Sequence, residues 1–114
     1  MSLANYRKVQ NSAGTPRSLE RRLVAEITGE MITHWDAGNR GAQLMPVLHR
    51  NREMWTLFSS ACGASGNELS PELRASIISL ALWVDRFTSD VVAEREEISP
   101  LIDINQDLLE GLMN

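Results

Sequence analysis

This sequence has little of what disulfides, aromatic cores or membrane insertion require. Its single cysteine excludes a disulfide within the chain. Aromatic residues make up only 5% of its 114 residues, so a core must be mainly aliphatic. No apolar run approaches the roughly 20 residues of a membrane-spanning helix, and the first residues lack the apolar stretch of a signal peptide. These absences predict a soluble protein of the cytoplasm.

Positive charge is also in short supply. The chain has 11 Lys and Arg against 15 Asp and Glu, which gives a net charge of −4. Proteins that bind nucleic acid draw much of their affinity from neutralising phosphates, so this balance argues against nucleic acid as the main ligand. No segment alternates apolar and polar residues in the way that a β-strand does. The pattern that remains is helical.

The strongest helical signal covers residues 70–95. Ser70 can cap the first turn and Pro71 suits a first helical position, so the segment begins as helices do. An apolar stripe, which we expect to face the core, follows at spacings of three and four residues: Leu73, Ile77, Leu80, Val84, Phe87 and Val91. Ile78 and Leu82 project from the opposite face. A second apolar face indicates either a helix packed on both sides or a surface for a partner.

The rest of the chain repeats this pattern with weaker signals. Helices are expected over residues 3–12, 16–35, 42–61, 70–95 and 100–112. The prediction is one all-α domain over residues 1–114, an antiparallel helical bundle of four main helices plus a short N-terminal helix. Asn51 falls on the core stripe of its helix, so its side chain needs a hydrogen-bond partner there.

Residues that could carry chemistry are few and scattered. His34 and His49 lack the three or four coherently spaced ligands of a zinc site. Cys62 has no His or Cys beside it in the sequence, and the glycine-rich segment 63–66 lacks the Lys of a phosphate-binding loop. We therefore expect no catalytic residues, no metal and no cofactor, and a protein that is not an enzyme.

Three arginines form a candidate basic patch. Arg17, Arg21 and Arg22 crowd the first turns of the helix over 16–35, where their charge opposes the helix dipole. Such a cluster is either a solvated face or a contact for an acidic partner. Both interpretations stay open.

Several motifs together resemble the flagellar FlaF family. They are Tyr6-Arg-Lys-Val-Gln10, Thr15-Pro-Arg-Ser-Leu-Glu20, Asn51-Arg-Glu-Met-Trp55, the run from Leu73 to Val84, and Pro100-Leu-Ile-Asp-Ile-Asn-Gln106. The likeness covers nearly the whole chain. It implies a small cytoplasmic protein of flagellated alphaproteobacteria that acts beside the flagellin-mRNA regulator FlbT. It also implies that the protein binds flagellin as an export chaperone does.

A flagellin chaperone would need exposed apolar surface. Flagellin ends are disordered before assembly and form amphipathic helices in the filament, and such helices bind in apolar grooves. The candidate contact residues are Met31, Trp35, Ile78, Leu82, Leu109, Leu112 and Met113. Each of them could instead belong to the core.

Two functions follow from this resemblance and stay open. The first is a chaperone or adaptor that binds newly made flagellin and promotes its synthesis or export. The second is a post-transcriptional regulator that acts on flagellin mRNA, directly through the three arginines or together with FlbT. Self-association of the helices is a further possibility that the sequence leaves open.

Overall fold

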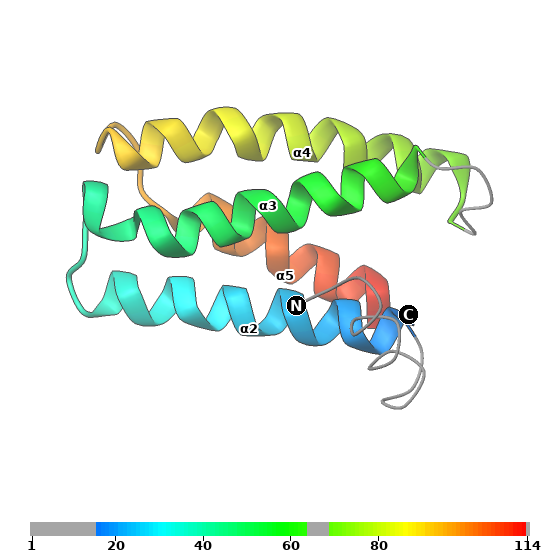
Figure 1. Cartoon of the computed structure of the whole chain (residues 1–114), viewed down its shortest axis with the longest axis horizontal. Helices are drawn as coiled ribbons and strands as arrows, with labels where there is room; N and C mark the ends of the chain where they lie inside the picture. Colours follow the sequence, from blue (N-terminus) through cyan, green and yellow to red (C-terminus); the bar gives the residue numbers. More distant parts are fainter. Residues whose placement is uncertain (1–15, 64–68, 114) are drawn as a thin grey trace.

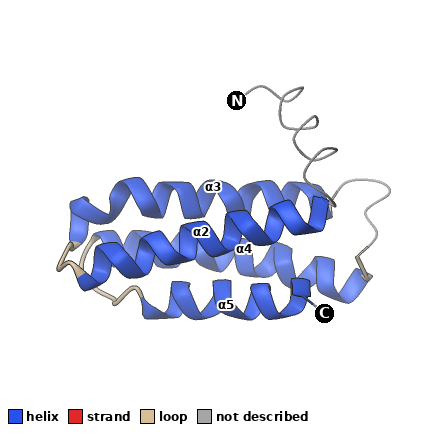
Figure 2. Cartoon of the chain, turned by 90° about the horizontal axis from the view of Figure 1, so that it is seen from below, coloured by secondary structure: helices blue, strands red, loops and turns tan. Residues whose placement is uncertain are grey.

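The structure is a computed structural model that describes residues 16–63 and 69–113 (Figure 1). Its elements are α2 (Pro16–Asp36), the short 3₁₀ helix η1 (Gly41–Leu44), α3 (Met45–Cys62), α4 (Pro71–Val92) and α5 (Ser99–Met113). The described residues contain no strand (Figure 2). The four helices form an antiparallel bundle, which confirms the predicted fold class. The short helix predicted over residues 3–12 lies outside the described residues.

Local sequence explains where α4 begins. The Ser70 hydroxyl accepts a hydrogen bond from the backbone N–H of Leu73 at 3.2 Å. Pro71 follows in the first turn, where a backbone N–H has no partner within the helix. Pro46 likewise lies in the first turn of α3, as its second residue. The α-helix there begins at Met45, three residues later than predicted, because residues 41–44 form the 3₁₀ turn.

The end of α4 differs from the prediction. The helix stops at Val92 rather than Arg95, and Glu94 has a left-handed φ of 59°. The amides of Glu94 and Arg95 donate to the carbonyls of Val91 and Asp90, at 3.0 and 2.9 Å. This is a Schellman motif, in which glycine usually takes the position that Glu94 holds. The sequence has no glycine here, so no residue in it marks the end of the helix.

The core lies between all four helices and is mainly aliphatic. Its buried apolar residues are Val24, Ile27, Met31, Leu44, Val47, Leu48, Met54, Trp55, Cys62, Ile77, Val84, Val91, Ile98 and Leu101. This composition agrees with the scarcity of aromatic residues. At about 25 cal/mol for each Å² of apolar surface removed from water, burial of these side chains is the main force holding the bundle together.

A buried polar cluster ties three of the helices together. Asn105 of α5 accepts a hydrogen bond from Trp55 Nε1 of α3 at 2.8 Å. Its amide donates to Asn51 Oδ1 at 2.8 Å and to Thr28 Oγ1 of α2 at 3.1 Å. The prediction that Asn51 needs a partner is therefore confirmed. No α4 residue takes part in these hydrogen bonds, so the buried polar contacts of Asn105 tie α5 to α2 and α3.

The helices on either side of α4 contact it very differently. α3 packs along much of α4, and Arg52 Nε of α3 lies 3.0 Å from Asp85 Oδ1. α5 contacts α2 far more than α4, and in Figure 1 it runs obliquely away from α4 toward α2. The bundle is thus closed on the α3 side of α4 and less closed on the α5 side.

Candidate functional site

An apolar groove runs between α4 and α5. It consists of two adjoining hollows of about 130 and 340 Å³, which share Leu80, Ile104 and Asp107. The residues lining this α4–α5 groove are Trp55 at its floor, Leu73, Ser76, Ile77, Leu80 and Trp83 from α4, and Pro100, Asp103, Ile104, Asp107, Leu108 and Gly111 from α5. Ligand pockets run from about 300 to 1,000 Å³. The larger hollow lies at the low end of this range and the smaller one lies below it. Their size suits inserted side chains better than a large ligand.

The groove exists because the apolar stripe of α4 is divided between two environments. Ile77, Val84 and Val91 are buried, as predicted. Leu73 is 39% exposed and Leu80 is only half-buried, although both belong to the predicted core stripe. The prediction that the whole stripe belongs to the core was therefore wrong for Leu73 and Leu80. The physical reason is that α5, held by Asn105, leans toward α2 and does not cover them.

Two stacked aromatic rings stand on the α5 side of α4. Trp83 and Phe87 lie with their ring centroids 4.8 Å apart and their planes 22° from parallel. Both rings are half-buried, and Trp83 lines the groove. Trp83 lies off the predicted stripe, so the apolar periodicity of the helix does not single it out. The signal in the sequence was an aromatic residue next to the apolar stripe of α4, which indicates that the apolar face of this helix is wider than the stripe.

The two rims of the groove differ in charge. Asp103 and Asp107 line it from α5 and are exposed, and none of the ion pairs in the described structure involves either carboxylate. The α4 rim carries the exposed and uncharged Ser76. The groove therefore combines apolar walls with one acidic edge.

Ile78 and Leu82, the predicted contacts on α4, lie on its other face. They are 36% and 64% exposed, so they are surface residues. Their helical positions place them on the same side of α4 as Asp85, which contacts α3. Ile78 and Leu82 therefore lie outside the groove, and their role in binding stays a prediction.

The structure separates the remaining predicted contacts. Met31 has no exposed surface and lies in the core, so it cannot contact a partner of the folded bundle. That candidate is excluded by its complete burial. Leu109 is half-buried against the core. The side chains of Leu112 and Met113 lie outside the described part of the structure.

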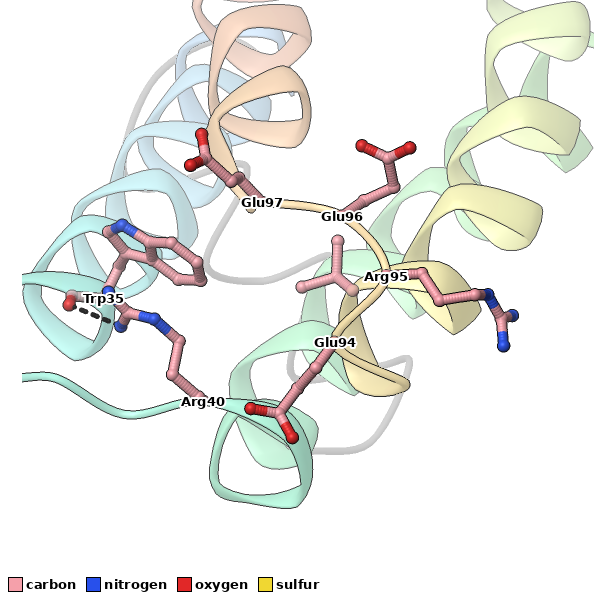
Figure 3. Close-up of a pocket in the computed structure, with 7 residues that line it drawn as sticks. Trp35, Arg40, Glu94, Arg95, Glu96 and Glu97 are labelled. Atoms are coloured by element: carbon pink, nitrogen blue, oxygen red, sulfur yellow. Dashed lines mark hydrogen bonds between the residues drawn. The ribbon is translucent and has the colours of Figure 1, made fainter.

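Trp35 lines a different hollow, of about 440 Å³, at the end of the bundle where α4 leads into α5 (Figure 3). The Arg40 guanidinium lies 3.3 Å from the centroid of the indole ring and donates to the Trp35 carbonyl at 2.9 Å. Glu94, Glu96 and Glu97 form much of the remaining wall. With the ring covered by Arg40 and the walls charged, this hollow offers little apolar surface.

The structure describes the side chains of two of the three arginines in the predicted basic patch, so the patch stays a prediction. Arg22 is exposed and Arg21 is half-buried, while the Arg17 side chain lies outside the described residues. Farther along α2, Glu26 and Glu30 hold Arg50 of α3 in ion pairs. The hydrogen bond with Glu30 raises the pKa of Arg50. Arg50 is thus paired with carboxylates of α2.

Groups with potential chemistry are separate from one another. Burial raises the pKa of the Cys62 thiol, which disfavours the thiolate through which a cysteine reacts. His49 pairs with Glu53 at 3.0 Å, and His34 Nδ1 lies 3.0 Å from Asn39 Nδ2. Within the described ranges, no three His, Cys, Asp or Glu side chains are placed to share a metal ion.

No helix among the described residues is long and apolar enough to cross a bilayer. The sequence matches the family described as flagellar protein FlaF over residues 2–112, nearly its whole length. No curated protein and no solved structure matches the chain.

Proposed function

We propose, from the premise that the chain belongs to the FlaF family of flagellar proteins, that it is a flagellin-binding adaptor of the cytoplasm. It would hold newly made flagellin before export, without catalysis. The single observation that supports a binding role is the α4–α5 groove, an apolar surface that the bundle leaves uncovered.

The shape of this groove favours a helix as its occupant. Two antiparallel helices with apolar facing sides leave a channel into which a third helix can place one edge. Its hollows would receive side chains spaced three or four residues apart, which is the spacing of an amphipathic helix. Flagellin ends are expected to be such helices once they fold. Binding would cover apolar surface on both proteins.

The walls of the groove contain residues of the kind that dominate helical interfaces. Trp83 is a large aromatic side chain, and Leu80 and Ile104 lie at the point shared by the two hollows. Large apolar and aromatic side chains near the centre of an interface usually carry most of its binding free energy. We therefore expect this shared point to be the centre of the contact.

A matched pair of substitutions on α4 tests this proposal. Leu73 lines the groove and Leu82 lies on the other face, and both are exposed, so neither Leu→Asp change should unfold the bundle. Leu73→Asp should weaken flagellin binding about tenfold or more, roughly 1.4 kcal/mol, since it places a charge on an apolar contact. Leu82→Asp should bind as the unchanged protein does. The affinities are measured by calorimetry, with circular dichroism as the check on folding.

Two other results would replace the proposal. Weaker binding by Leu82→Asp alone would move the site to the face of Ile78 and Leu82. The regulatory alternative predicts that the protein retains flagellin leader RNA, and that Arg21→Glu with Arg22→Glu abolishes that retention while leaving flagellin binding unchanged. Whether the protein is a flagellin adaptor or a regulator of flagellin mRNA, we still expect it to act together with an FlbT-type regulator.

A further inference from the structure

The α4–α5 groove presents a specific combination of surfaces. Its walls are apolar, and its α5 rim carries Asp103 and Asp107, to which the described structure gives no ion-pair partner. Its complement is therefore a helix with a narrow apolar edge and positive charge beside that edge. A helix with acidic residues in those positions would be repelled by the rim.

The first residues of this chain have that composition. Leu3, Tyr6 and Val9 recur at every third position and give one apolar edge when the segment is helical. Arg7 and Lys8 lie among them, and residues 1–15 contain no Asp or Glu. The segment is thus basic in a chain whose net charge is −4.

The length and attachment of this segment also fit the groove. α2 begins at Pro16, at the end of the antiparallel bundle where α4 begins and α5 ends, so the segment is joined to the bundle at the same end as the first turns of α4 that line the groove (Figure 1). Residues 3–12 as a helix would be about 15 Å long, the same as the rise along α4 from Leu73 to Trp83. Residues 13–15 can span about 10 Å between the two.

The family comparison gives independent support for a role of this segment. The match begins at residue 2, fourteen residues before the first described helix. The first residues therefore belong to the unit that defines the family and are not an addition to it.

We propose that residues 3–12 dock into the α4–α5 groove as an amphipathic helix, with Leu3, Tyr6 and Val9 toward its walls and Arg7 near the acidic rim. The segment then occupies the surface that a partner helix needs. Since it is joined to the bundle by a short linker, its effective concentration is millimolar, and weak contacts suffice to hold it. Its role as a competitor rests on the proposed function, whereas the docking itself does not.

Disulfide trapping tests the docking without any partner. In the full chain with Cys62→Ser, Gln10→Cys is combined with Ser76→Cys in the groove or, as the control, with Ser60→Cys on α3. Both serines are exposed, and both lie near the end of the bundle where α2 begins. The groove pair should form an intramolecular disulfide at least about tenfold faster than the control pair under mild oxidation. Mass spectrometry identifies the linked residues.

Equal rates for the two pairs would overturn the docking. Disulfides formed between two chains would also overturn it, because they would place a second copy in the groove.

The competition is tested with Tyr6→Asp and Val9→Asp together, which should tighten flagellin binding about threefold or more because the groove is then vacant. A trapped disulfide with no flagellin binding would reject the proposed function but keep the docking. If Leu73→Asp weakens flagellin binding but the groove pair is trapped no faster than the control pair, the docking is rejected and the proposed function is kept.

Discussion

The two sides of α4 show how one helix can serve both as core and as binding surface. Toward α3 the interface is closed: α3 packs along much of α4, and Arg52 forms an ion pair with Asp85 at its edge. Toward α5 the same helix leaves Leu73 and Leu80 beside two hollows. The two interfaces share α4 and differ in what holds the neighbouring helix. Apolar residues on a helix are therefore core only where a neighbour is held against them.

The position of α5 explains the open side. Its one buried amide, Asn105, bonds to residues of α2 and α3, at distances of 2.8 to 3.1 Å. A buried amide left without partners costs about 1–3 kcal/mol, so these bonds fix the rotation and register of α5 against those two helices. No comparable group holds α5 to α4. The open side of α4 thus coincides with a polar anchor in α5 that reaches α2 and α3.

The largest expected effect compares the two halves of the α4 stripe. Val84→Asp should destabilise the bundle by about 4 kcal/mol or more, since the charge would be fully buried. Leu80→Asp should cost only about 1–2 kcal/mol, because its side chain already borders solvent. Urea unfolding followed by circular dichroism measures both free energies. Equal losses would mean that the α5 side of α4 is as closed as the α3 side.

The next effect concerns the anchor of α5. Asn105→Leu should lower the free energy of unfolding by about 3 kcal/mol, since it leaves the Trp55 N–H and the Asn51 and Thr28 oxygens without this partner. Gln106→Leu is the matched control, on the next residue of α5 and exposed. Its free energy of unfolding should stay within about 0.5 kcal/mol of the original. Similar values for both variants would remove Asn105 as the cause of the open side.

The smallest effect concerns the ion pair at the closed interface. A double-mutant cycle of Arg52→Ala and Asp85→Ala should give a coupling below about 1 kcal/mol, because both side chains are partly solvated. The coupling should fall as salt is added. A larger, salt-independent value would show that polar contacts, and not the buried stripe of α4, close the α3 side.

Much of the fold could be predicted because its signals are local. Ser70 and Pro71 fix the start of α4 through one capping bond and one ring, and neither depends on the rest of the chain. The apolar periodicity predicted the helices and their class for the same reason. The stop at Glu94 could not be predicted, since a residue other than glycine there adopts a left-handed φ only because the surrounding contacts hold it.

The candidate site was predictable only in part. Ile78 and Leu82 were correctly identified as the face opposite the stripe, and they are exposed. Met31, a candidate contact for which a core position was left open, is buried, whereas Leu73, which belongs to the apolar stripe, is exposed. Periodicity shows which residues share a face of a helix, but which face a neighbour covers depends on tertiary contacts such as those of Asn105.

Methyl NMR of the protein with and without flagellin tests the central claim, that the α4–α5 groove receives a partner helix. With labelled Ile and Leu methyl groups, addition of flagellin should shift or broaden the signals of Leu73, Leu80 and Ile104. The signals of Ile78 and Leu82 should stay where they are. Changes confined to Ile78 and Leu82, or no change at saturating flagellin, would contradict the account.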